Sequence, residues 1–549
     1  MRMIKLLGAA ALLASTATMA QTVKEEYQDY EQMEMVPFVG SDIGGAPREA
    51  SGPTFGNVVQ SFQGISQYDV ATYARNFIPP DTMGAVGTTQ YTEFVNGGFA
   101  VYNKSNGSVA KATSDLAFWA AAGQTGANGD SRVMFNKAAG RWVAISFGAS
   151  VSDIQIAVSN TADAAGTWQS TKFTGFAGGT ADYPTLALDG NVAYIGTNNF
   201  NSSGNFRGTT LNIIPLSSLF NAGAPTTTGR AVVNTPYSPT TGGADGGFAI
   251  QGVNSSSAST TGLVVAASLF YDDVLRYNIT NVGTPSAAVV SKAYIGTADY
   301  AANDFARQPN AVPDVGSTSA FPNNDRVIDT LDQRIGSSVY EVNGRIYAVY
   351  TVTPIGGDTT YIRYDVIDAA TNQILDEHMI GDGVHDYFQG SLSVNKYGQV
   401  VIGYNRSGSG EDGKISVMAR IYSTGATGQL TQRGAEMLLK VSLVDDYHNG
   451  SVDGQIALGR QRWGDYSAVS LDPTNDRSFW VIGEYAREYN DAAGGHPGGT
   501  GGSRWSTWIS QISTGTAVPE PSSWMMMIAG FGIVGAARRR QRRMETVIA

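Results

Sequence analysis

The chain of 549 residues contains no cysteine, so it forms no disulfide, holds no metal–thiolate site and has no cysteine nucleophile. It also lacks a Walker phosphate loop, a G-x-S-x-G serine elbow and an HExxH pair among its four histidines. Charged residues make up only 15% of the chain, and no long amphipathic helix is evident. Its fold must therefore be stabilised by an apolar core and hydrogen bonds, without disulfide cross-links.

The N-terminus has the order of a secretory signal peptide. Arg2 and Lys5 form a short basic start, residues 6–14 are apolar, and the small-x-small end at residues 18–20 precedes Gln21. We therefore predict that residues 1–20 are a signal peptide, cleaved by signal peptidase after Ala20. The alternative is a buried core helix, which the basic-apolar-small order does not favour.

The C-terminus carries a more specific pattern over residues 518–543. A Pro-Glu-Pro triplet and a nearby tryptophan precede an uncharged run from Met525 to Ala537 and then an arginine cluster. This pattern resembles the PEP-CTERM sorting signal. The resemblance implies processing by an exosortase, brief membrane insertion through a short hydrophobic helix, and a role in the envelope or biofilm of a Gram-negative bacterium that makes exopolysaccharide. The residues that carry it are Pro519, Glu520, Pro521, Trp524, Arg538, Arg539 and Arg540.

The length and charge of this tail support the same prediction. The uncharged run is shorter than the ~20 residues that cross a bilayer comfortably, which argues against a permanent anchor. Basic residues stay on the cytoplasmic side, so the arginine cluster would leave the bulk of the chain outside. An ordinary tail anchor of the mature protein remains the alternative.

Removing both ends makes the chain more acidic. Lys plus Arg falls from 36 to 29 and Asp plus Glu from 47 to 45, so the mature net charge is about −16, against −11 for the whole chain. An acidic surface argues against nucleic acid or anionic lipid as the main partner. It is compatible with neutral polymers, such as a polysaccharide, or with divalent cations.

The region between the two ends reads as a repeated β structure. Residues 21–75 form a polar lead-in whose last part could pack on the following domain, and residues 76–515 carry apolar hairpin patterns with Gly, Asn or Asp turns. Three hairpins share an Asp-Tyr head: Asp182-Tyr183, Asp386-Tyr387 and Asp465-Tyr466. Weaker copies cover residues 81–102, 132–147, 248–269 and 335–351.

Together these hairpins give about seven units of roughly 50 to 70 residues, which fits propeller blades with loop insertions. We therefore predict an all-β fold, a β-propeller of about seven blades. The alternatives are a β-helix, whose rungs are far shorter, and tandem sandwiches, which would need a linker near the middle of the chain.

Two further stretches resemble known propeller families. Residues 161–168, which end in Thr167-Trp168, are similar to the Asp-box of sialidase-type propellers, although Gly166 falls one place late. In those families the box is a structural turn whose Trp is buried between blades. The stretch from Pro79 through Tyr102 resembles the opening of a family of uncharacterised secreted bacterial propellers.

In a propeller, residues just before the innermost strands converge around a central funnel. Acidic and aromatic side chains there would suit sugars, because carboxylates accept hydrogen bonds from hydroxyl groups and Tyr rings stack on sugar faces. The alternative is that each Asp only caps the turn that enters its strand. The candidate ligand-binding residues are Asp81, Asp182, Tyr183, Arg334, Asp386, Tyr387, Asp465, Tyr466 and Glu484, with Asp130 as a further neighbour.

A non-catalytic, surface-displayed binder of glycan or another surface polymer is the leading functional hypothesis, and a sialidase-like glycoside hydrolase is the alternative. A hydrolase would need arginines, a Tyr supported by a Glu, and an acid/base Asp; Arg132, Arg462 and the candidates above supply these types, but no spacing links them. We expect no cofactor. Two oxygen-rich loops, residues 472–476 and 323–325, could hold Ca²⁺ or be ordinary Asx turns.

Overall fold

The computed structural model describes residues 56–515, apart from 76, 239–243, 258–260, 302, 304, 310–326, 411, 446, 448–459 and 490–502. The predicted signal peptide with Ala20, most of the lead-in, and the predicted sorting signal with its apolar run lie outside the described residues. Within the described part, no helix is long and apolar enough to span a membrane.

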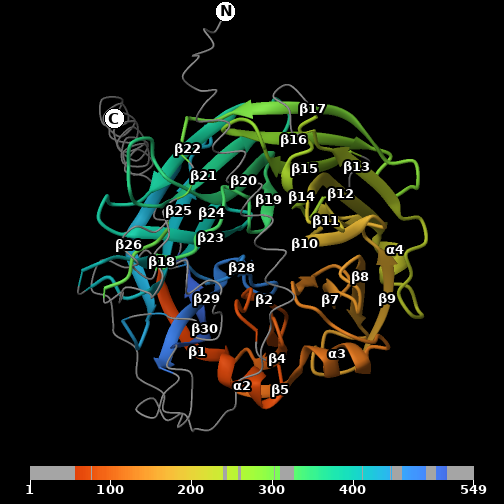
Figure 1. Cartoon of the computed structure of the whole chain (residues 1–549), viewed down its shortest axis with the longest axis horizontal. Helices are drawn as coiled ribbons and strands as arrows, with labels where there is room; N and C mark the ends of the chain where they lie inside the picture. Colours follow the sequence, from red (N-terminus) through yellow and green to blue (C-terminus); the bar gives the residue numbers. More distant parts are fainter. Residues whose placement is uncertain are drawn as a thin grey trace, which may run out of the picture.

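The described residues form a ring of seven four-stranded antiparallel blades, so the predicted β-propeller is confirmed (Figure 1). The first strands of successive blades contact one another around the axis, as β2 (Met83–Val86) does with β6 (Arg132–Asn136). In the first blade, β2 is followed by β3 (Gln90–Val95), β4 (Gly98–Asn103) and β5 (Val109–Ser114), and in the second blade β6 is followed by β7 (Arg141–Phe147), β8 (Asp153–Ser159) and β9 (Trp168–Thr174). The third blade contains β10 (Gly179–Leu188), β11 (Val192–Asn201), β12 (Phe206–Pro215) and β13 (Ala231–Pro236).

The fourth and fifth blades are joined by a short parallel pairing of their first strands, Val253 and Asn254 with Val339 and Tyr340. The fourth blade contains β14 (Phe248–Asn254), β15 (Gly262–Ala267), β16 (Asp273–Thr280) and β17 (Ala288–Gly296). The fifth contains β19 (Val339–Val342), β20 (Arg345–Val352), β21 (Tyr361–Asp368) and β22 (Ile374–Ile380), and the sixth contains β23 (Asp386–Val394), β24 (Gln399–Ser407), β25 (Ser416–Thr424) and β26 (Leu430–Val441).

The seventh blade closes the ring by combining both ends of the domain. Its inner strands are β28 (Ala468–Leu471), β29 (Ser478–Tyr489) and β30 (Ser503–Ser513), and its outer strand is β1 (Asn57–Ser66). We expected the propeller to span residues 76–515, but this outer strand comes from the segment that we described as a lead-in. The domain therefore depends on residues well before position 76.

Glu93 on β3 ties this closing strand to the first blade. Its carboxylate accepts hydrogen bonds from the Ile65 backbone N–H at 2.9 Å and the Tyr102 hydroxyl at 2.8 Å, and also from the Thr507 hydroxyl on β30. Burial raises the pKa of Glu93 to about 7, although these donors oppose the shift. One buried side chain thus holds together strands from both ends of the domain.

Helices are short and lie between strands. They are α2 (Gln67–Thr72), which Ser66 and Asp69 begin with a capping box, α3 (Asp115–Ala121) and α4 (Leu216–Leu219). The side chain of Trp168 packs edge-on against Phe118 of α3, with ring centroids 5.1 Å apart, and its indole N–H donates to the carbonyl of Ala164 at 2.9 Å. Residues 161–168 are therefore a structural turn, as the Asp-box resemblance implied.

The Asp-Tyr heads are not structurally equivalent, which corrects the repeat alignment. Strands β10 and β23 each have an irregularity in pairing, between Asp182 and Thr185 and between Phe388 and Ser391. At each irregularity one residue has a left-handed backbone conformation: Tyr183 in β10 (φ 52°) and Gln389 in β23 (φ 51°). Gln389, and not Tyr387, therefore occupies the position of Tyr183.

Candidate functional site

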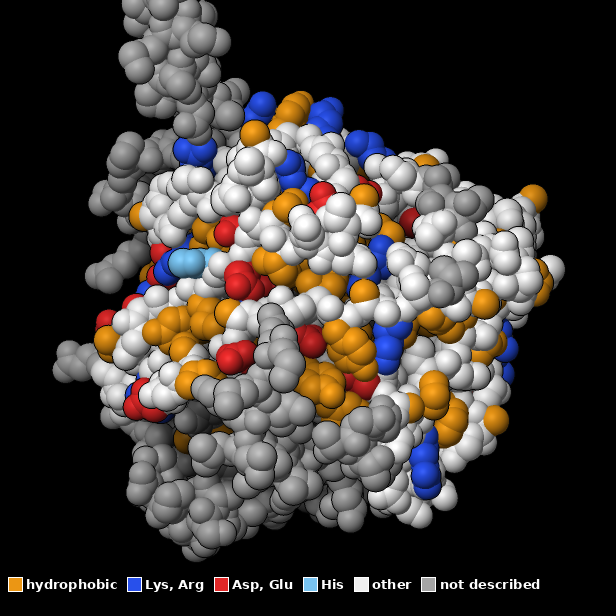
Figure 2. Space-filling model, turned by 90° about the horizontal axis from the view of Figure 1, so that it is seen from above, with side chains coloured by type: hydrophobic (Ala, Val, Ile, Leu, Met, Phe, Trp, Pro, Cys, Tyr) orange, Lys and Arg blue, Asp and Glu red, His pale blue; other side chains and the backbone are white. Residues whose placement is uncertain are grey.

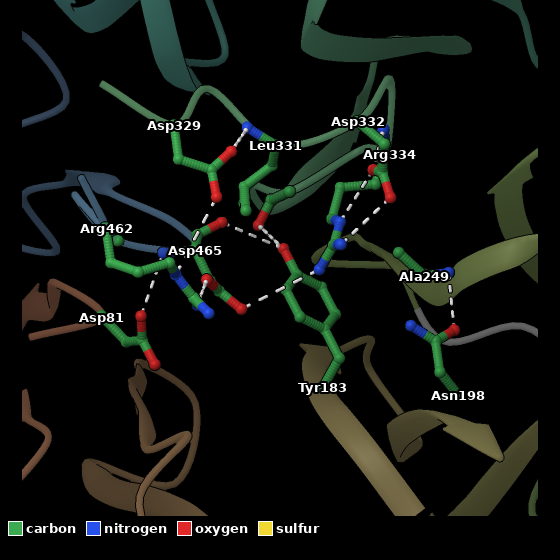
Figure 3. Close-up of polar contacts among 12 residues, drawn as sticks. Asp81, Tyr183, Asn198, Ala249, Asp329, Leu331, Asp332, Arg334, Arg462 and Asp465 are labelled. Atoms are coloured by element: carbon green, nitrogen blue, oxygen red, sulfur yellow. Dashed lines mark hydrogen bonds and ion pairs between the residues drawn. The ribbon is translucent and has the colours of Figure 1, made fainter. Parts of the chain in front are cut away.

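A segment of the long connection between β17 and β19 covers the inner ends of the blades. The connection includes β18 (Val327–Ile328), which pairs in parallel with β27 (Arg460–Gln461) ahead of the closing blade. The next eight residues, Asp329–Gly336, lie above Tyr183 and beside Asp465, and we call them the central segment (Figure 3). This segment occupies the place where a propeller funnel would open.

The central segment is held by a buried network of arginines and carboxylates. Arg334 binds Asp332 through two hydrogen bonds, at 2.8 and 3.0 Å, and its Nη1 lies 3.8 Å from a carboxylate oxygen of Asp465. The other oxygen of Asp465 accepts from Arg462 at 2.9 Å, and Arg462 lies 4.0 Å from Asp329. Charges buried in this way are stable only when each is paired, so the network locks the segment in place.

Two tyrosines form the floor beneath this network. The rings of Tyr183 and Tyr466 meet edge to face, with centroids 5.9 Å apart, and the Tyr183 hydroxyl donates to the carbonyl of Asp465 at 3.2 Å. The guanidinium of Arg132 lies over the Tyr466 ring at 3.3 Å, and that of Arg334 lies over the Tyr183 ring at 4.6 Å. Burial raises the pKa of both tyrosines, so the phenols stay protonated.

Asp81 joins the network from the first blade. One carboxylate oxygen accepts from the backbone N–H of Asp465 at 2.9 Å (Figure 3). The other accepts from the side-chain amide of Asn96 at 2.7 Å. Asp81 itself has a left-handed backbone, with φ 50°, as does Asp130 in the second blade. Asp81 thus caps the segment that enters the seventh blade.

The structure brings some candidate residues together and separates others. Asp81, Tyr183, Arg334, Asp465 and Tyr466 meet at the centre. Asp386 and Tyr387 lie away from it, because Gln389 and not Tyr387 occupies the position of Tyr183 in its blade. Asp386 binds the Arg307 guanidinium at 2.8 Å, and Tyr387 packs on other tyrosines between the fifth and sixth blades. Asp182 is buried on β10 opposite Asn198.

Glu484 on β29 lies beside the centre and has an unusual environment. It is fully buried, and neither carboxylate oxygen has a hydrogen-bond partner within the described part of the chain. Burial, and then the nearby carboxylate of Asp81, raises its pKa well above 4.5. The folded protein therefore holds Glu484 as a neutral acid under conditions in which the unfolded chain would ionise it.

This environment predicts a pH effect on stability. Because the folded pKa is raised, the free energy of unfolding should fall as pH rises above about 4.5, by at most about 1.4 kcal/mol per pH unit from this group, until the folded pKa is reached. In Glu484→Gln, urea unfolding at pH 4 to 8 should show a shallower decline and higher stability at pH 8. Equal slopes for wild type and variant would contradict the assignment.

The central cluster leaves almost no free space. All nine candidate residues are at least 94% buried. The cavity between the central segment and the blades measures about 20 Å³ and is lined by Asp332, Arg334, Gln389, Asp465 and Tyr466, among others. That volume holds about one water molecule. No sugar ring can enter this cluster while the central segment stays in place.

Sequence reasoning missed the carboxylates that close the centre. Asp329 and Asp332 lie outside the repeated hairpin patterns, although Asp332 is only two residues before Arg334, its partner of opposite charge. Asp332 is the direct partner of Arg334. A search for buried arginines and their acidic neighbours could have suggested the pair, but not its position over the axis.

The oxygen-rich loop at residues 472–476 is arranged as a turn. Asp472 accepts hydrogen bonds from the backbone and hydroxyl of Thr474, and forms an ion pair with Lys104 at 2.8 Å. The second candidate loop, residues 323–325, lies outside the described residues. In the described ranges, no three His, Asp or Glu side chains gather as ligands for a metal ion.

Comparison with known proteins identifies the C-terminal signal. Residues 517–543 match the family model of the PEP-CTERM protein-sorting motif. The chain carries a PEP-CTERM sorting motif. This motif indicates an exported surface protein that is sorted by an exosortase. A search of curated proteins gave no match.

Solved structures that resemble this chain are distant in sequence. The Dos1 propeller is 11% identical, with a TM-score of 0.35, and the match covers 85% of this chain and 97% of that one. Drosophila Semaphorin 1a, extracellular domains 1-2, is 9% identical, with a TM-score of 0.36 and coverage of 84% and 88%. A thermostable family-43 glycoside hydrolase is 9% identical, with a TM-score of 0.29 and coverage of 70% and 88%.

Proposed function

We propose that this PEP-CTERM protein is displayed outside the cell as a propeller that binds a glycan or another surface polymer without turning it over. The observation that carries the non-catalytic part is the closed centre. Arg334, Arg462, Asp332 and Asp465 are paired with one another, and the space among them holds about one water molecule. A hydrolase needs open space for a sugar between two carboxyl groups.

The character of the surface supports a polar partner. On the face drawn in Figure 2, hydrophobic side chains lie in separate groups among polar and charged ones. A large continuous apolar patch would instead favour a hydrophobic protein interface. The acidic mature chain, with its net charge of about −16, further favours a neutral polymer over an anionic one.

A sialidase-like hydrolase is the second candidate, because arginines, tyrosines and acids converge at the central cluster. Arg132 lies over Tyr466, and its Nη2 has no hydrogen-bond partner within the described part of the chain. This reading requires the central segment to move and expose the arginines. A hydrolase of this kind would use the same arginines and carboxylates that form the closed network, so its activity would be lost when one of them is replaced.

Two measurements test the proposal. We expect the exported protein to show no turnover on a panel of sialosides and neutral glycosides, and Asp465→Asn to leave that baseline unchanged. Turnover by the wild type that Asp465→Asn abolishes would contradict the non-catalytic assignment and favour the hydrolase. Mass spectrometry of the mature protein should place its C-terminus near Pro519–Pro521; an intact tail ending at Ala549 would contradict exosortase processing.

A further inference from the structure

A continuous row of aromatic side chains leads from the central cluster to the edge of the fourth blade. Phe248 lies beneath Arg334, with 4.9 Å between the guanidinium carbon and the ring centroid. Successive ring centroids along the row are 5.1 to 6.4 Å apart, which lies within the usual range for packed aromatic pairs. The row consists of Phe248, Phe206, Tyr237, Phe270, Tyr271 and Tyr294, with spacings of 5.4, 5.1, 6.0, 6.4 and 5.7 Å.

The outer end of this row lies at the same end of the blade as the closed centre. In the fourth blade, Phe248 pairs with Ala267, Ala267 pairs with Val274, and Asp273 pairs with Gly296. Tyr271 sits in the turn between β15 and β16, and Tyr294 is near the end of β17. Both therefore stand at the strand ends that surround the central segment.

The last two rings of the row are exposed, although they are held in place from behind. Tyr271 is 49% exposed and Tyr294 is 42% exposed, and their rings meet at 88°. Phe270, which contacts the Tyr271 ring, is 96% buried. A ring that is fixed by a buried neighbour loses little conformational entropy when a ligand stacks on it.

Lys292 adds hydrogen-bond donors beside these rings. Its ammonium donates to the hydroxyl of Tyr294 at 3.0 Å and to the backbone carbonyl of Asp245 at 2.9 Å. An ammonium has three N–H donors, so a third can point to a ligand hydroxyl. Because Lys292 already donates to the Tyr294 oxygen, the Tyr294 hydroxyl can give its own hydrogen to an acceptor on the ligand.

Acidic side chains next to the rings limit the charge of the ligand. Asp272 and Asp273 follow Tyr271 directly, and the pKa of Asp272 is raised first by burial and then by the carboxylates of Asp299 and Asp273. These three carboxylates outnumber the cations nearby, Arg363 and Lys292, so the site disfavours a uronic acid. Carboxylates that accept hydrogen bonds from hydroxyl groups instead favour neutral sugars.

From these contacts we infer that Tyr271, Tyr294 and Lys292 form a binding platform for a neutral polysaccharide on the outer part of the fourth blade. A pyranose ring stacks on Tyr271 while its hydroxyl groups bond to Lys292 and the Tyr294 hydroxyl. The inference rests on the proposed polymer-binding function. It places the binding at this open site and not in the closed centre, at the same end of the molecule.

Native affinity electrophoresis of the exported protein tests this platform. The gels contain hydroxyethylcellulose, galactomannan or dextran as neutral probes, and alginate as the anionic probe. We expect retardation in at least one neutral gel and none in alginate. Tyr271→Ala should weaken the apparent affinity about tenfold, whereas Tyr271→Phe should keep the stacking and most of the affinity.

The matched control is Tyr397→Ala. Tyr397 is 52% exposed, and the ammonium of Lys396 lies over its ring at 5.2 Å, as that of Lys292 lies over the Tyr294 ring at 4.7 Å, but Tyr397 is in the turn between β23 and β24. Equal losses in the Tyr271 and Tyr397 variants, or alginate retardation that Tyr271→Ala removes, would overturn the inference. If a neutral gel retards the wild type and the Tyr271→Ala variant equally, the platform is wrong but the proposed binding function stands. A wild type that no gel retards would overturn both the platform and the proposed binding function.

Discussion

Replacing Arg334 by alanine is expected to lower the free energy of unfolding by about 3 to 5 kcal/mol, because the change leaves the buried carboxylate of Asp332 without its partner. Arg334 is 97% buried, makes two hydrogen bonds to Asp332, and covers the rings of Tyr183 and Phe248. Urea unfolding measures the loss. Limited proteolysis should cut the variant within the central segment, Asp329–Gly336, well before it cuts the wild type.

Two controls separate this effect from a general loss of charge. Lys172→Ala breaks an exposed ion pair with Asp153, 3.5 Å in length, and should cost less than about 1 kcal/mol. The double variant Arg334→Ala/Asp332→Ala removes the unpaired carboxylate as well, so its loss should be smaller than the sum of the two single losses. Additive losses, or an Arg334 variant as stable as the wild type, would show that the network does not hold the central segment.

Removing strand β1 is expected to have the other large effect. A chain that begins at Gln67 lacks the outer strand of the closing blade, so β30 keeps β29 but loses β1 on its other edge, and Glu93 loses the Ile65 N–H. Phe62, whose ring lies 6.2 Å from that of the buried Trp480, is lost too. Thermal unfolding should lose its cooperativity, or its midpoint temperature should fall by at least about 10 °C.

A chain that begins at Gly56 keeps the whole of β1 and is the matched control. We expect it to melt within a few degrees of a chain that begins at Gln21, since the pairing of Asn57 to Ser66 with β30 is intact in both. A chain from Gln67 that melts like this control would show that the ring closes without β1. The propeller would then begin near residue 76, where the sequence placed it.

Hairpin patterns predicted the blades well, because each antiparallel blade is a local structure. Alternating apolar residues, turn residues and strand lengths are all encoded within about 50 residues. The pattern around Gly190, for example, predicted the β10–β11 hairpin, and that around Asn343-Gly344 predicted β19–β20. The count of seven blades followed from these local units.

The candidate site was predicted less well, for two physical reasons. A one- or two-residue difference in register is invisible when only a dipeptide is compared, yet it moved Asp386 and Tyr387 away from the centre. The position of the central segment depends on contacts between residues far apart in the chain, such as Arg334 with Asp465 and Asp329 with Arg462. No local pattern encodes those pairs.

The sequence by itself determined that the chain is addressed for export, that it has no thiol chemistry, and that it is built from repeated β hairpins, since sorting signals, composition and strand periodicity are all read over short stretches. Only the tertiary structure decided that residues 57–66 close the ring and that Asp329–Gly336 fill its centre. Both depend on the free energy of burying and pairing groups that are hundreds of residues apart, as Ile65 and Thr507 around Glu93 illustrate.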